Sequence, residues 1–179
     1  MSVIKVNENI SLSQTTMNDC HAMVNYLADK EIYNTTLNIP FPYTIKDAEY
    51  IVDYFEKSHI EHGRLVNWAI RNSNHQLIGV IGFHNGIKSH KSEIGYWLAK
   101  PYWGKGIMTD VLQSVCQYAF QQFNLIRITA TIFEHNLASQ KVLEKCNFVL
   151  EGNCLTNYYL KEGKAINAKL YALTKHYER

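Results

Sequence analysis

The order of elements in the second half of the chain constrains the fold more than any other feature. A strand-like apolar run, Glu93–Ala99, leads through the segment WGKG into a helical pattern that begins at Met108, and a second strand-like run, Leu125–Phe133, follows. A strand, a helix and a strand in succession form a right-handed parallel crossover. Patterns typical of β-hairpins flank this unit and imply antiparallel pairing. The sequence therefore predicts an α/β fold with a mixed sheet.

Local patterns predict the remaining elements. Apolar runs at Leu65–Ile70 and Gln76–Phe83, separated by turn-forming Asn and Ser residues, are typical of a hairpin. The segment YNTTLNIPFPYT, residues 33–44, contains two prolines and is predicted to be a loop. Further helices are expected at Met17–Leu27, after an N-cap at Thr44 and at Leu137–Cys146, and further strands at Ile10–Leu12, Phe148–Leu155 and Ile166–Leu173.

The composition is that of one domain covering residues 1–179. Apolar residues make up 46% of the chain and charged residues 19%, which is enough apolar chain to bury a core. The 18 basic and 16 acidic residues form no block of like charges, so the net charge of +2 gives no support for nucleic-acid binding. The N-terminus has no signal-peptide pattern, and no window approaches the roughly 18 apolar residues of a membrane span. We expect a cytoplasmic protein that does not bind membranes.

Cysteine and histidine spacing gives no pattern of a metal site. The four cysteines form no CxxC pair, and three of them lie in apolar-periodic segments. They are expected to be reduced thiols that fill the core. The eight histidines show no HExxH or comparable ligand spacing. We therefore predict no bound metal.

The glycines of WGKG lie at the mouth of the strand–helix unit. Glycine allows backbone N–H groups to point outward, and the N-terminal end of the following helix adds partial positive charge, so Gly104 and Gly106 suit a phosphate. The spacing matches neither GxxxxGK[ST] nor GxGxxG. On this loop alone, an ordinary turn before a helix remains the alternative.

The loop does not stand alone. The segments EIGYWLAKPYWGKGIMTDVL and HNLASQKVLEKCNFVLEG together resemble the GNAT acetyltransferase superfamily, in particular its RimJ/RimL-like branch. The resemblance extends to IPFPYTIKDAEYIVDYF and YYLKEGKAINAKLYAL, and so covers nearly the whole chain. It implies a GNAT fold, with a mostly antiparallel sheet of six to seven strands flanked by helices and a parallel pair that splays at the cofactor. It also implies transfer of an acetyl group from acetyl-CoA to a primary amine.

The same resemblance implies a set of cofactor-binding residues. The superfamily's pyrophosphate loop, [QR]xxGx[GA], falls on a segment in which Trp103 replaces the usual Arg or Gln and Met108 the small residue. Asn136 matches an asparagine that binds the pantetheine arm, although an Asn at this place is also a good helix N-cap. The expected cofactor contacts are Trp97, Leu98, Ala99, Trp103, Gly104, Lys105, Gly106, Ile107, Met108, Thr109, Asn136 and Ser139.

Two residues are candidates for proton transfer. By resemblance, Ser139 faces the thioester sulfur, while Leu143 replaces the tyrosine that protonates the thiolate in many relatives. Glu93 is the best-placed general base on the strand before the loop, and a solvated strand glutamate is the alternative. A second glutamate used by some RimL-like enzymes would fall near Tyr158, where none is present. An acetyl-cysteine on Cys146 or Cys154 has no paired histidine to support it, so we expect direct transfer.

The acceptor amine is predicted from the resemblance and from the composition of residues 32–46. The resemblance favours the α-amine of a protein N-terminus, such as that of a ribosomal protein, and leaves a polyamine or aminoglycoside acceptor, a non-catalytic acyl-CoA sensor and a homodimer open. Residues 32–46 contain no carboxylate, which is unfavourable for a polyamine. Three aromatic residues of this region are expected near the amine channel: Tyr33, Phe41 and Tyr43.

Overall fold

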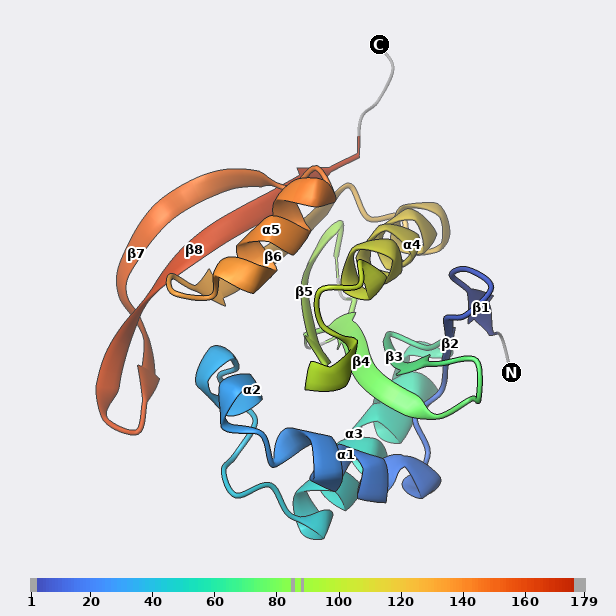
Figure 1. The fold of residues 1–179 in the computed structure, drawn as a ribbon. Coiled ribbons are helices and arrows are strands. Elements are labelled where there is room, and N and C mark those ends of the chain that lie inside the picture. The colour runs from blue at the N-terminus through green and yellow to red at the C-terminus, as the bar shows by residue number, and fades with distance from the viewer. Residues whose placement is uncertain (1–2, 85, 88, 176–179) are drawn as a thin grey trace.

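The computed structural model describes residues 3–84, 86–87 and 89–175. Within these residues the strands form one sheet in the order β1-β2-β3-β4-β5-β6-β8-β7 (Figure 1). Its strands are β1 (Ile4–Lys5), β2 (Ser11–Ser13), β3 (Asn67–Arg71), β4 (Leu77–Phe83), β5 (Lys91–Leu98), β6 (Arg127–Phe133), β7 (Val149–Lys161) and β8 (Lys164–Thr174). The described β5–β6 pair is parallel, whereas the other described pairs are antiparallel. The predicted mixed, mostly antiparallel sheet is confirmed, with the short β1 as an additional strand.

Helices cover both faces of the sheet and give it two cores (Figure 1). Residues of α4 and α5 pack with one face, and residues of α1, α2 and α3 pack with the other. We call the core on the side of α4 and α5 the upper core, and the core on the side of α1, α2 and α3 the lower core. The helical elements are η1 (Met17–Asp19), α1 (Cys20–Leu27), α2 (Lys30–Thr35), α3 (Ile45–His62), η2 (Lys100–Tyr102), α4 (Ile107–Gln122) and α5 (Leu137–Lys145).

Helix α2 corrects the start of the predicted loop at residues 33–44: it includes residues 33–35, whereas residues 36–44 form no helix or strand. Asp29 caps its N-terminus by accepting a hydrogen bond from the Glu31 backbone N–H at 2.7 Å. The Thr35 and Thr36 hydroxyls both donate to the carbonyl oxygen of Ile32, at 3.1 Å and 2.9 Å. The two prolines of the segment follow the helix and do not enter it. The capped short helix therefore forms upstream of the prolines, which do not interrupt it.

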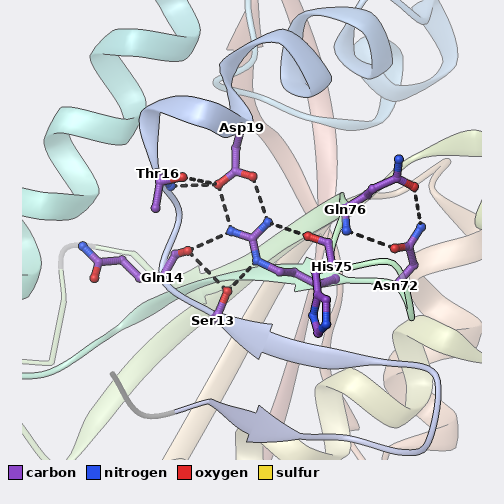
Figure 2. A network of polar contacts seen from close by, with 8 residues as sticks. Ser13, Gln14, Thr16, Asp19, Asn72, His75 and Gln76 are labelled. Atoms are coloured by element: carbon purple, nitrogen blue, oxygen red, sulfur yellow. Dashed lines mark hydrogen bonds and ion pairs between the residues drawn. The ribbon is translucent and has the colours of Figure 1, made fainter.

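A buried ion pair joins η1 to the sheet. The two terminal nitrogens of Arg71 on β3 donate to the two carboxylate oxygens of Asp19, at 2.8 Å and 2.9 Å. Figure 2 shows the polar network around this guanidinium, which also reaches the Ser13 hydroxyl and the carbonyl oxygens of Gln14 and His75. Both side chains are largely withdrawn from solvent, with 13% and 7% exposed. This network fixes the start of the α1 region against β2 and β3.

The two central strands separate partway along their length. Strand β5 pairs with β6 only over Lys91–Glu93, opposite Arg127–Thr129. Beyond this ladder, β5 continues to pair with β4, and β6 continues to pair with β8. The sheet therefore opens between β5 and β6 after Glu93, at the place where the parallel pair was predicted to splay.

Candidate functional site

The splay exposes one edge of β5. The carbonyl oxygen of Glu93 accepts from the His84 N–H, and the Ala99 N–H donates to the Ile78 carbonyl, each at 2.8 Å on the β4 side. Backbone groups of successive strand residues point to alternate edges. The N–H and C=O groups that face the splay therefore belong to the even-numbered residues Ile94, Tyr96 and Leu98. Such an edge can pair with an extended ligand.

This alternation refines the predicted cofactor contacts at the strand end. Of the three expected residues, Leu98 directs its backbone into the splay, whereas Trp97 and Ala99 direct theirs toward β4. The side chains alternate as well. Tyr96 packs against the upper core, and Trp97 packs against the lower core. Each face of the sheet thus receives different side chains from the open segment of β5.

Glu93 lies at the branch point of the two strands. Its carboxylate accepts a hydrogen bond at 3.2 Å from the backbone N–H of Thr131, a β6 residue beyond the end of the ladder. Burial, and then the negative charge of Glu93, raise the pKa of the Tyr159 phenol to about 12. By strand alternation, the Glu93 side chain is on the same face as that of Trp97. The carboxylate therefore lies at the splay on the side of the lower core.

Ser139 and Tyr96 meet on the opposite face. The Ser139 hydroxyl, in the first turn of α5, lies 2.7 Å from the Tyr96 phenolic oxygen and is buried. Burial raises the pKa of Tyr96 well above its ordinary value, so the phenol keeps its proton at neutral pH. A phenol is a stronger hydrogen-bond donor than an alkyl alcohol. When Tyr96 donates to Ser139, the serine hydroxyl is left with a proton to give to a third group.

Tyr96 was not predicted as a site residue. In EIGYWL it is one aromatic residue in an apolar run, and such a residue is usually part of the core. The available signal was its position: Ile94, Tyr96 and Leu98 share one face of the strand, and Tyr96 alone of the three has a polar side chain.

Asn136 caps helix α5, as the capping interpretation predicted. Its side-chain oxygen accepts from the Ser139 backbone N–H at 3.1 Å. Its side-chain nitrogen donates to the carbonyl oxygen of Thr35 at 3.4 Å, which ties the start of α5 to the end of α2. The cap orients Ser139 through its backbone and leaves the serine hydroxyl for Tyr96.

The glycine loop ends in a set of outward-facing donors. Gly104 and Gly106 have φ values of 72° and 77°, in the left-handed region that favours glycine, and Gly106 is the N-cap of α4. The first helical bond runs from the Asp110 N–H to the Gly106 carbonyl. The N–H groups of the first turn precede this ladder and have no partner within the helix: they belong to Ile107, Met108 and Thr109. With the helix dipole, these donors suit an anion.

Trp103 performs a different task from an Arg or Gln at this position. Its indole N–H donates to the carbonyl oxygen of Leu98 at 2.6 Å, and so ties the glycine loop to the end of β5. The Met108 side chain is buried in the upper core, so Met108 contributes only its backbone to the loop opening. The Lys105 ammonium lies 5.5 Å from the centroid of the Tyr102 ring.

The three predicted acceptor residues divide into two groups. Tyr33 and Phe41 form a tilted aromatic pair with ring centroids 5.3 Å apart. Tyr43 is buried in the lower core, where burial raises its pKa far above the ordinary value. The structure therefore brings Tyr33 and Phe41 together at the end of α2 and places the Tyr43 side chain within the packing of the helices.

The described cysteines give little support to a covalent intermediate. Burial raises the pKa of Cys146 to about 11, so its reactive thiolate is scarce at neutral pH. Cys154 is exposed on β7 and contacts the Thr156 hydroxyl. Leu143, at the position of the absent tyrosine, is fully buried in the upper core.

Two further properties concern the whole of the described chain. Residues 3–84, 86–87 and 89–175 contain no group of three His, Cys, Asp or Glu side chains arranged to hold a metal ion. None of their helices is both long and apolar enough to span a membrane.

Comparison with known proteins gives consistent results. Residues 9–149 match the profile of a family described as an acetyltransferase (GNAT) domain. The chain is 30% identical over 179 residues to the uncharacterized N-acetyltransferase YoaA of Bacillus subtilis (strain 168), covering 98% of each protein. It is 31% identical over 101 residues to the [ribosomal protein uS5]-alanine N-acetyltransferase of Escherichia coli (strain K12), covering 55% of this chain and 52% of that one. The fold resembles that of RimL, a ribosomal L7/L12 α-N-protein acetyltransferase solved with coenzyme A, with a TM-score of 0.85, 23% identity and coverage of 97% and 98%.

Proposed function

This chain belongs to the GNAT acetyltransferase family and is an acetyl-CoA-dependent N-acetyltransferase, and from that premise we propose that its acceptor is the α-amine of a protein N-terminus. A ribosomal protein is the proposed source of that N-terminus, because curated relatives of partial coverage act on ribosomal-protein alanine and serine. The observation that carries the proposed acceptor is the charge pairing near α2, where Asp29 and Glu31 face Lys100. The placement of Glu93 and Ser139 on opposite faces of the same splay supports the transfer reaction itself.

The residues present fit acetyl-CoA as a co-substrate. We infer that the pyrophosphate binds at the glycine loop, where the first-turn N–H groups of α4 have no partner in the helix. The pantetheine arm would pair with the open edge of β5, through the backbone of Tyr96 and Leu98. A backbone N–H of this edge would also stabilise the thioester oxygen as negative charge develops on it.

The two faces of the splay suit the two proton transfers of a direct reaction. On the side of the lower core, Glu93 would take a proton from the incoming ammonium, directly or through water. The neutral amine would then attack the thioester carbonyl to form the C–N bond, and the C–S bond would break as the nitrogen loses its second proton to water. On the side of the upper core, Ser139 would give its proton to the leaving sulfur while Tyr96 donates to the serine oxygen, and the serine would recover a proton from water. This arrangement favours an enzyme over a non-catalytic acyl-CoA sensor.

Charge near α2 favours a peptide over a polyamine. The carboxylates that flank the acceptor region already have partners: Asp29 and Glu31 face Lys100, and Asp47 is bonded to Thr44 in the cap of α3. A second ammonium of a polyamine would therefore find no unpaired carboxylate among these groups. A peptide N-terminus requires one amine site and hydrogen-bonding partners for its backbone.

The proposal is tested by acceptor-dependent release of free CoA. Short peptides that begin with Ser or Ala should support turnover, whereas the same peptides with a blocked N-terminus should not. Spermidine and an aminoglycoside serve as competing acceptors. A kcat/KM for spermidine about tenfold or more above that for every peptide would replace the proposed acceptor. Tight binding of acetyl-CoA by calorimetry, without CoA release for any amine, would identify a sensor.

A further inference from the structure

Lys161 makes an unusual set of contacts at the end of β7. Its ammonium donates to the carbonyl oxygen of Tyr33 and, at 2.6 Å, to that of Thr36. It also lies 3.5 Å from the centroid of the Tyr33 ring and 6.0 Å from that of Phe133. Figure 1 shows the hairpin of β7 and β8 reaching to the level of α2, the helix that contains Tyr33 and has Thr36 as its C-cap. One lysine thus connects two segments that are more than a hundred residues apart in the chain.

These contacts form a binding site for an ammonium group. Carbonyl oxygens at a helix C-terminus carry partial negative charge, and an aromatic face attracts a cation. Both kinds of group surround the Lys161 ammonium, and the Glu162 carboxylate is close enough to raise the pKa of the Tyr33 phenol by hydrogen bonding. Burial lowers the pKa of Lys161, which indicates that these groups replace part of its water shell. We call this set the ammonium cage.

The ammonium cage adjoins the proposed reaction site. Asn34 and Thr35 lie in the chain between Tyr33 and Thr36, whose carbonyl oxygens bind Lys161. Their own carbonyl oxygens contact the start of α5: that of Asn34 lies 3.1 Å from a ring nitrogen of His135, and that of Thr35 accepts a hydrogen bond from the Asn136 side chain. The side-chain oxygen of Asn136 in turn accepts a hydrogen bond from the backbone N–H of Ser139. The Tyr33 ring that lies under Lys161 also packs on Phe41, a predicted acceptor residue.

We propose that Lys161 determines acceptor specificity by filling the ammonium cage, so that amines with a second positive charge are excluded from the acceptor site. The proposal rests on the N-acetyltransferase function described above. A monoamine or a peptide N-terminus brings one ammonium, which meets Glu93 and loses its proton there. A diamine brings a second ammonium, and the groups that would bind it are occupied by the chain's own cation, which also repels it.

The test uses a matched pair of acceptors, butylamine and 1,4-diaminobutane, which differ only by the second amine. Replacing Lys161 by Met removes the charge and keeps an unbranched side chain of similar length. The kcat/KM ratio of diamine to monoamine should then rise by about tenfold or more, because the cage becomes available and the repulsion is lost. Lys164→Met, at an exposed lysine across the same turn, is the matched control and should leave the ratio unchanged.

A second variant separates specificity from anchoring of α2. Lys161→Gln also lacks the charge, but its amide can still donate hydrogen bonds, so it serves if the Met variant does not fold. It should show the same rise in the ratio. If Lys161 only holds α2 in place, both acceptors lose activity together and the ratio stays constant, which overturns the proposal. Failure of the wild type to acetylate any amine would instead remove the proposed function, and this inference with it.

Discussion

Tyr96 and Ser139 are joined by a hydrogen bond of 2.7 Å that connects β5 to the first turn of α5. Both residues lie at the splay, yet they come from elements that are separated in sequence by the glycine loop, α4 and β6. Either oxygen can be the donor, and because burial raises the pKa of Tyr96, a neutral phenol is available to donate to Ser139. Tyr96 therefore acts as a positioning residue for Ser139 in the proposed mechanism.

Removal of the Tyr96 hydroxyl should slow the chemical step without weakening cofactor binding. Tyr96→Phe keeps the ring in the upper core and is expected to lower kcat by about tenfold, and Ser139→Ala by about tenfold or more, with the affinity for acetyl-CoA little changed. Steady-state kinetics and calorimetry measure the two quantities. Ser139→Ala retains the backbone N–H that Asn136 caps, so the cap of α5 should persist. It leaves the buried Tyr96 hydroxyl without its serine partner, which should cost about 1–3 kcal/mol in the free energy of unfolding.

The double variant decides whether the two residues act together. If Tyr96 works through Ser139, then Tyr96→Phe should cause no further loss of kcat in a Ser139→Ala background. Independent, multiplicative losses would show that Tyr96 contributes only packing or an unrelated contact.

The left-handed conformation of Gly106 leads to a prediction for the cofactor loop. An added Cβ at Gly106 would meet no atom within 4 Å, so Gly106→Val acts through backbone strain at φ 77° and not through a clash. The loop should lose the arrangement of its N–H groups, and acetyl-CoA binding should disappear in calorimetry while the circular dichroism spectrum is retained. Gly63→Val is the matched control: it has φ 64° and equally open surroundings at the end of α3, and it should retain binding.

Local patterns predicted most of the fold, because strand alternation, helical periodicity and turn residues are properties of short segments. The parallel pair followed from the strand–helix–strand order, and the flanking hairpin from turn residues between two apolar runs. Helix α2 was missed because the prolines at the end of its segment outweighed the Asp29 cap at the start. The short β1 has too few residues for alternation to be recognised.

The part of the candidate site that could be predicted from the sequence lies in short local motifs. Glu93, Ser139 and the glycine loop lie in motifs that resemble a known family. Lys161 is different: its partners at the end of α2 are 125 or more residues away, so nothing in its own segment indicates an ammonium cage. Contacts of this kind depend on how distant elements pack.

The buried Arg71–Asp19 pair predicts a large effect on stability. Asp19→Asn leaves the guanidinium buried without its charged partner and should lower the free energy of unfolding by about 3–5 kcal/mol. Asp53→Asn is the matched control, because it breaks an exposed pair with Lys57 on α3 and should cost less than about 1 kcal/mol. Urea denaturation monitored by circular dichroism measures both. Equal midpoints for the two variants would contradict the structural importance of the network.

Glu93 permits a separation of catalytic and structural roles. The side chain accepts a hydrogen bond from the Thr131 N–H, and Glu93→Gln retains a carbonyl oxygen that can accept the same bond. The amide cannot take a proton from the acceptor amine. If Glu93 is the general base, kcat/KM should fall by about a hundredfold or more, while the melting temperature stays close to that of the wild type.

The matching variant Glu93→Ala removes the acceptor as well as the base. It should lose activity to the same extent as Glu93→Gln and also lose stability, because the Thr131 N–H at the branch point no longer has its side-chain partner. Wild-type turnover by a stable Glu93→Gln protein would leave Glu93 with only its structural role at the splay.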